Sequence, residues 1–304
     1  MIDLASLFER RLGYPNPTAR ERLDRLVGLD EHKAKLTKVL GLLVNPKGLS
    51  DWGATHHPGS ELLLATVLHR PPLVILTGDV GSGKTELAES IGDAVARQEK
   101  IEVELLPLSL SARGQGKVGQ MTQLLSAAFD VMVAEASKMK SGQDNKGAII
   151  LLVDEADALV QSREGEMHHE DRSGVNAFIR GVDRLANQRL PAAVIMCTNR
   201  IHALDPAVKR RAAEMLVFGR PDDAGRRRLL APRLLAIGFE ASDIEALVRA
   251  TGPRNGEPGF TYSDLTQRLI PTIVLDAYPA SAIRPARAIE IAEQMTPTAA
   301  FTEA

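Results

Sequence analysis

The strongest chemical signal in the chain is a glycine-rich turn between a short apolar run and an amphipathic segment. Four of its positions have the spacing G-x-x-x-x-G-K-[ST]. In such a turn, backbone N–H groups surround phosphate oxygens, and the following helix adds partial positive charge at its N-terminus. The lysine reaches the β- and γ-phosphates, and the hydroxyl binds Mg²⁺. The sequence therefore predicts a site for a nucleoside triphosphate and Mg²⁺ at Gly78, Asp79, Val80, Gly81, Ser82, Gly83, Lys84, Thr85 and Glu86.

Two carboxylates directly follow a second apolar run, Ala148–Val153. Ligands of an open parallel sheet bind at the carboxyl ends of its strands, so we expect Asp154 and Glu155 beside the phosphate-binding turn. Asp154 would bind Mg²⁺ together with Thr85. Glu155 would orient or deprotonate the attacking water. An acidic helix start would also explain the pair, but the turn upstream favours the catalytic interpretation.

A third apolar run, Ala192–Cys197, ends at an amide and is followed by a basic segment. Asn199 could bind the same water or sense the γ-phosphate. The basic residues Lys209, Arg210 and Arg211 fit two interpretations. They are either the solvated end of a short helix or the source of an arginine that completes the ATP site of a neighbouring copy.

The elements that must position these residues alternate between strand and helix up to about residue 220. This pattern predicts a mostly parallel sheet between helices, an α/β core. Only helical patterns follow, so we expect a small all-α domain. The predicted domains are a helical arm (1–26), the α/β domain (27–221) and the helical domain (222–304). Within them we expect short helices before residue 27 with a break at 13–17, turns at 47–59, a long amphipathic helix at 120–139, a charged loop at 161–173, and a helix at 205–215.

Composition limits the classes of function. The chain has 304 residues, a net charge of −2 and only 4% aromatic residues, which argues against a dedicated nucleic-acid binder. Its single cysteine excludes an internal disulfide. The sequence contains no apolar run of transmembrane length and no secretory signal pattern. We therefore expect no membrane partner and a cytoplasmic protein.

Taken together, these motifs resemble those of AAA+ ATPases. The Walker A segment is residues 78–85, the Walker B segment 149–157 and the sensor-1 segment 197–200. The resemblance implies a P-loop AAA+ core followed by an α-helical lid. It also implies that Val27 and Gly28 lie near the adenine. By the match of residues 199–211, Arg210 is the preferred trans-acting arginine finger and Arg211 the second choice.

Two stretches, residues 114–132 and 154–185, are most similar to the pachytene-checkpoint type of AAA+ enzyme, which remodels HORMA-domain proteins. This resemblance implies a homo-oligomer, a hexamer, that grips a HORMA protein in its central pore. Bacterial enzymes of this type are associated with HORMA proteins that control an anti-phage second-messenger synthase. The predicted pore-loop contacts are Leu110, Arg113, Lys117, Arg163 and His168.

The chain also departs from this family pattern. The first pore loop lacks the usual aromatic residue, and Ser263 stands where relatives have a sensor-2 arginine. Arg268 lies nearby, but we do not assign it that role. Two alternatives are a clamp- or helicase-loader-like ATPase, which the charge balance disfavours, and a non-hydrolysing nucleotide-binding scaffold, which Lys84, Asp154 and Glu155 disfavour.

Overall fold

The computed structural model describes residues 7–110, 120–141, 144–159, 169–200, 202, 204–254 and 256–300. The chain divides into two compact units. The first unit consists of residues 1–25, 31–77 and 85–217, and the second of residues 26–30, 78–84 and 218–304. The boundary runs through the Walker A segment, between Lys84 and Thr85. No helix among the described residues has the length and apolarity needed to cross a membrane.

A six-stranded sheet with the order β1-β3-β6-β7-β2-β8 is the centre of the first unit. The pairs β3/β6, β6/β7 and β7/β2 are parallel, whereas the edge strand β1 is antiparallel to β3. Parallel pairing brings the carboxyl ends of β2, β6 and β7 to one edge of the sheet. The strands are β1 (Leu12–Tyr14), β2 (Leu73–Gly78), β3 (Glu102–Ser109), β6 (Gly147–Asp154), β7 (Ala192–Thr198) and β8 (Ala212–Phe218).

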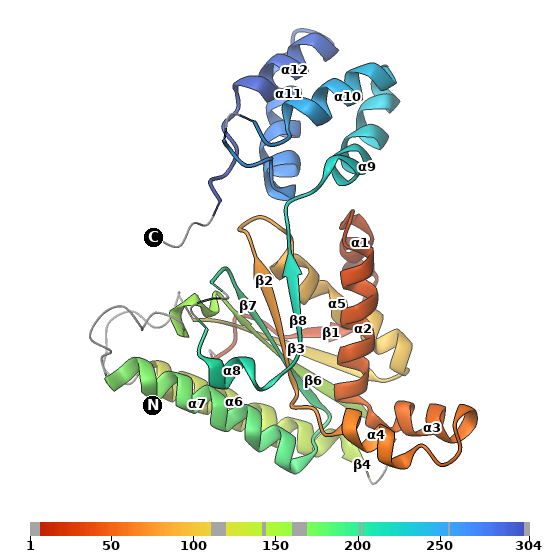
Figure 1. Ribbon diagram of the computed structural model, residues 1–304, viewed down its shortest axis with the longest axis vertical. Helices are drawn as coiled ribbons and strands as arrows, with labels where there is room; N and C mark the ends of the chain where they lie inside the picture. The colour runs from red at the N-terminus through yellow and green to blue at the C-terminus, as the bar shows by residue number, and fades with distance from the viewer. Residues whose placement is uncertain are drawn as a thin grey trace. The chain divides into compact units, whose positions relative to one another are not determined.

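Helices cover both faces of this sheet, which explains why its central strands are continuously apolar. Alternate residues, such as Ile75, Leu151 and Val194, belong to one buried cluster with Phe129 and Phe178. Figure 1 shows α6 and α7 side by side over that face, with α2 and α5 on the other side. The helices of the first unit are α1 (Pro17–Arg25), α2 (Asp30–Val44), α3 (Pro46–His56), α4 (Glu61–Leu68), α5 (Lys84–Glu99), α6 (Gln120–Met139), α7 (His169–Gln188) and α8 (Pro206–Lys209). The short elements η2 (Ala156–Leu159), β4 (Lys140–Ser141) and β5 (Asp144–Asn145) complete the unit.

The second unit contains a helical bundle around its own core, which includes Leu247, Phe260 and Leu269. The bundle begins at Asp222, whose carboxylate accepts a hydrogen bond from the Gly225 N–H at 2.7 Å and caps α9. Its helices are α9 (Asp223–Leu234), α10 (Ala241–Ala250), α11 (Ile270–Ala277) and α12 (Pro285–Gln294), with the single turn η3 (Leu235–Ile237) and the π-helical segment η4 (Asp264–Leu269).

The structure differs from the sequence expectations in five places. Residues 12–14 form an edge strand where we expected short helices with a break at 13–17, and residues 7–25 of the expected arm belong to the first compact unit. Residues 46–56 are helical although we expected turns at 47–59. α7 begins at His169, within the predicted loop. Residues 212–215 belong to β8, because pairing at the sheet edge overrides the helical propensity of Ala-Ala-Glu-Met.

Candidate nucleotide site

The magnesium-binding residues predicted from sequence meet in the first unit. Asp154 is the last residue of β6, and Thr85 stands in the first turn of α5. The Thr85 hydroxyl donates to Asp154 Oδ1 at 3.4 Å. A hydroxyl and a carboxylate are hard oxygen ligands of the kind that Mg²⁺ prefers, so this pair fits the predicted ion.

Glu155 occupies a backbone conformation that is uncommon for a side-chain-bearing residue. Its φ is 51°, in the left-handed region, and its N–H donates to the Asp154 Oδ1 atom at 2.8 Å. Such strain persists when the surroundings impose it, and it often occurs at functional sites. The bend exposes the Glu155 side chain at the carboxyl end of the sheet, as a general base needs.

Asn199 is oriented by a carboxylate that the sequence analysis did not single out. Asp157, in η2, accepts from the Asn199 backbone N–H at 2.9 Å and from its side-chain Nδ2 at 3.0 Å. It also accepts from the hydroxyl of Thr198. These bonds orient the amide and use one of its two Nδ2 hydrogens, so the second N–H can donate to a phosphate oxygen and the amide oxygen can accept from a water. Asp157 was detectable only as the last residue of the Walker B segment.

The two candidate arginine fingers have different surroundings. Arg211 makes a two-pronged ion pair with Asp183, at 2.6 and 2.9 Å, and this contact raises the pKa of its guanidinium. Arg210 follows α8, is exposed, and has no side-chain partner among the described residues. The arrangement leaves Arg210 able to reach another molecule, whereas Arg211 is used within the chain.

The phosphate-binding loop belongs to the second unit. Lys84 is only 7% exposed, and its ammonium donates to the carbonyls of Gly78 and Asp79 at 2.8 and 2.7 Å. The Ser82 hydroxyl lies 3.3 Å from the same nitrogen. The ammonium is thus directed into the loop, where a phosphate would compete with these carbonyls for its protons.

Glycine is required where the loop approaches other backbone. Gly81 has a φ of 73°, and a Cβ there would lie 2.8 Å from the Cβ of Ser263. The Ser263 N–H donates to the Gly81 carbonyl at 3.1 Å. The segment containing Val27 and Gly28 also packs here, since a Cβ on Gly83 would meet Leu29 at 3.2 Å. Whether Val27 and Gly28 contact adenine stays a prediction.

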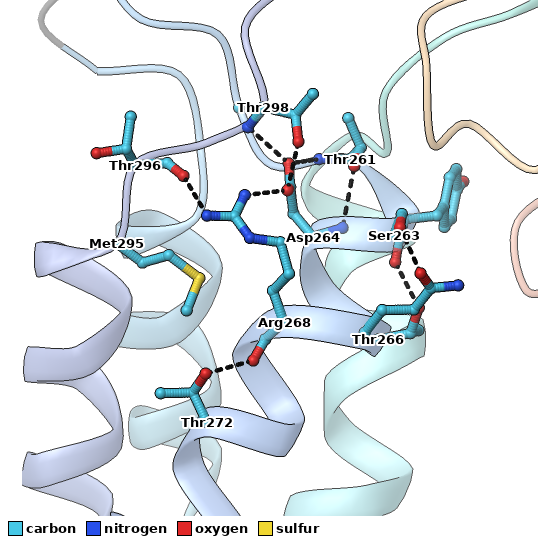
Figure 2. Close-up of polar contacts among 12 residues, drawn as sticks. Thr261, Ser263, Asp264, Thr266, Arg268, Thr272, Met295, Thr296 and Thr298 are labelled. Atoms are coloured by element: carbon cyan, nitrogen blue, oxygen red, sulfur yellow. Dashed lines mark hydrogen bonds and ion pairs between the residues drawn. The ribbon is translucent and has the colours of Figure 1, made fainter.

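Arg268 is committed to contacts inside the lid. It donates to Asp264 at 2.6 Å and to the Thr296 carbonyl at 3.1 Å, as Figure 2 shows. Asp264 also accepts from the Thr261 and Thr298 N–H groups, both at 3.0 Å, and from the Thr298 hydroxyl at 2.7 Å. Burial would raise the pKa of Asp264, but these hydrogen bonds outweigh it and lower the pKa to about 2. The contacts agree with leaving Arg268 without a sensor-2 role.

The remaining predicted residues divide into three groups. Leu110 is fully buried in the core cluster, so the prediction that it grips a substrate is wrong for this conformation. Arg113, Lys117, Arg163 and His168 lie outside the described residues. Of the residues predicted to bind the nucleotide, Val80 is 50% exposed, and Glu86 pairs with Arg22 at 2.6 Å. Their predicted contacts with the nucleotide stay predictions.

A strand, a glycine-rich turn with a buried lysine, and a strand-end Asp-Glu pair define a P-loop nucleotide-binding protein. The profile of the "ATPase family associated with various cellular activities (AAA)" matches residues 74–220. CD-NTase-associated protein 6 of Escherichia coli strain MS 115-1 is 60% identical over 303 residues, covering 99% of this chain and 97% of that protein. The chain belongs to the AAA ATPase family.

Two solved structures show which type of AAA protein this chain resembles. A chain in the "Structure of E. coli MS115-1 HORMA:CdnC:Trip13 complex" is 60% identical, with a TM-score of 0.92 and 99% coverage of both chains. A Rhizobiales Trip13 chain is 56% identical, with a TM-score of 0.76, covering 96% of this chain and 99% of that one. These findings confirm the predicted AAA+ fold and its similarity to the pachytene-checkpoint type.

Proposed function

We propose that this chain is an ATP-hydrolysing AAA+ remodeller that acts, as a ring, on a HORMA-domain protein in bacterial anti-phage signalling. The observation that carries the proposal is the 60% identity to the chain solved together with HORMA and CdnC proteins. Function is inferred from the site as well as the fold. Lys84, Asp154 and Glu155, which we expect hydrolysis to use, support this proposal.

In the proposed reaction, Lys84 and the loop N–H groups bind the phosphates, while Thr85 and Asp154 bind Mg²⁺. When bound there, Mg²⁺ would supply positive charge that neutralises the charge developing on the transferred phosphoryl group. Glu155, exposed by its bent backbone, orients a water molecule and accepts its proton. Asn199, aligned by Asp157, positions the same water through its amide oxygen. This arrangement favours hydrolysis over a passive nucleotide scaffold.

The ring enters the proposal through Arg210. An exposed guanidinium without a partner in the described residues suits a contact with a neighbouring subunit's phosphate. Arg210→Ala should therefore bind ATP but hydrolyse it slowly. Mixing it with Lys84→Ala should restore some activity, because mixed interfaces combine one intact loop with one intact arginine. The matched control is Arg211→Ala, which removes the internal ion pair with Asp183. Mixing Arg211→Ala with Lys84→Ala should not restore ATPase activity.

The partner is tested with a trapped complex. Glu155→Gln removes the proposed base, so it should bind ATP and retain substrate. The purified variant is incubated with a HORMA-domain protein, with ATP or with ADP, and analysed by size-exclusion chromatography. We expect co-elution in ATP only, with Lys84→Ala as the negative control. Equal co-elution of Lys84→Ala would disprove ATP-dependent engagement. Salt-sensitive DNA binding without HORMA binding would support the loader function instead.

A further inference from the structure

Arg220 lies where β8 leaves the sheet and connects three parts of the second unit. Its Nε donates to Asp79 Oδ2, in the phosphate-binding loop, at 2.7 Å. Its Nη1 donates to the Gly259 carbonyl of the lid at 2.6 Å and to the Thr298 carbonyl at 2.8 Å. One guanidinium thus joins the loop, the lid and residues 296–300, which follow α12.

The charge of Asp79 makes this contact relevant to nucleotide binding. A carboxylate in a loop that receives a triphosphate repels it, and the low-dielectric surroundings strengthen the repulsion. The Asp79 side chain is 25% exposed and that of Arg220 only 11%, so solvent screens this pair little. Arg220 neutralises the carboxylate and fixes its direction at the same time.

Lid stability alone does not explain an arginine at this position. Nη2 of Arg220 is buried and has no hydrogen-bond partner among the described residues. An unsatisfied buried donor costs free energy. If the only role of residue 220 were to donate to two carbonyls, a neutral donor without a buried, unpaired nitrogen would cost less free energy than an arginine. The retained positive charge is explained by the carboxylate it faces.

We propose that Arg220 is a positioning residue for the ATP site, which neutralises Asp79 and ties the phosphate-binding loop to the lid and to residues 296–300. This inference rests on the proposed nucleotide binding but not on hydrolysis or on the HORMA partner. It extends the site beyond the Walker and sensor motifs to a contact 141 residues apart in sequence. It also links ATP affinity to the anchoring of residues 296–300.

The test measures ATP affinity by calorimetry in wild type, Arg220→Gln, and the double variant Arg220→Gln/Asp79→Asn. Arg220→Gln should weaken ATP binding about tenfold or more, because Asp79 then loses the guanidinium that faces its carboxylate. The double variant removes that negative charge as well and should bind ATP at least about threefold more tightly than Arg220→Gln. Arg227→Gln, which breaks an exposed lid pair with Glu245, is the matched control and should bind like wild type.

The results distinguish charge compensation by Arg220 from a purely structural role. Rescue by the second substitution supports charge compensation, which a purely structural role of Arg220 does not predict. Unchanged affinity in Arg220→Gln, or no rescue, overturns the proposal. If Arg220→Gln does not fold, the double variant decides alone, because it removes both charges of the pair. More than tenfold weaker binding in a folded double variant overturns the proposal. Absence of ATP binding in wild type would instead contradict the proposed function.

Discussion

The N-terminal helix α1 and the C-terminal residues 296–300 are held by different kinds of contact, one partly solvated and one buried. Near the N-terminal end, Arg22 pairs with Glu86 at 2.6 Å and Glu89 at 2.8 Å, on α5. Near the C-terminal end, Thr298 binds Asp264, whose side chain is only 1% exposed. The first set is partly solvated, with Arg22 at 29% and Glu86 at 42% exposure.

Solvent exposure determines how much each attachment contributes. Partly exposed ion pairs gain little because water and salt screen them. A buried carboxylate that accepts several hydrogen bonds leaves unsatisfied donors when it is removed. We therefore expect the C-terminal attachment to control the stability of the second unit, and the N-terminal attachment to contribute a small, salt-dependent effect.

The largest effect is expected for Asp264→Ala. The substitution leaves the hydrogen-bond donors of Thr261, Thr298 and Arg268 without their acceptor. It should lower the free energy of unfolding by about 3–5 kcal/mol. Urea unfolding, with hydrogen exchange at α10 amides, measures the loss. Asp276→Ala is the matched control, because it breaks a solvent-exposed carboxylate–arginine pair on the same unit. Equal losses in the two variants would show that burial does not distinguish these carboxylates.

A second prediction concerns acid stability. The pKa of Asp264 is lowered from 3.8 to about 2. A lowered pKa contributes stability that is complete above the ordinary value and is lost as pH falls towards the folded value. The second unit should lose about 2 kcal/mol between pH 4 and pH 2 from this group. In Asp264→Asn this component of the pH dependence should vanish, and a variant profile matching wild type would contradict the assignment.

The smallest effect is expected for Arg22→Ala. Loss of its pairs with Glu86 and Glu89 should cost about 1 kcal/mol or less at low salt and almost nothing in 1 M NaCl. Thermal unfolding at the two salt concentrations measures this. Arg25→Ala, which removes a more exposed pair with Glu21, controls for loss of an α1 arginine. A salt-independent loss in Arg22→Ala would indicate packing instead of charge.

An element can be predicted from sequence when the pattern that specifies it lies within the element itself, and not when it depends on contacts with distant residues. The bounds of α6 were predicted as Gln120–Met139, as found, because a long amphipathic pattern is set within the helix itself. β6 and β7 were likewise evident as apolar runs. The strand at Leu12–Tyr14 was missed, since three residues carry no pattern and only pairing with β3 makes them a strand.

The candidate site shows the same difference between residues that a local motif predicts and residues that only long-range contacts reveal. Lys84, Thr85, Asp154 and Glu155 follow from motif spacing, whereas the roles of Asp157 and Arg220 depend on contacts across 42 and 141 residues. The left-handed backbone of Glu155 was also not predictable from its residue type. Sequence therefore predicts the candidate reacting groups, and the structure adds Asp157 and Arg220, which hydrogen-bond to Asn199 and Asp79.

The most direct test of the central claim is the rate of phosphate release from ATP by wild type and by Glu155→Gln, with ATP affinity measured for both. If Glu155 activates water, the variant should bind ATP with unchanged affinity and release phosphate about 10²- to 10⁴-fold more slowly. Equal rates in the two proteins would contradict the assignment of Glu155 and, with it, the proposed mechanism of ATP-driven remodelling.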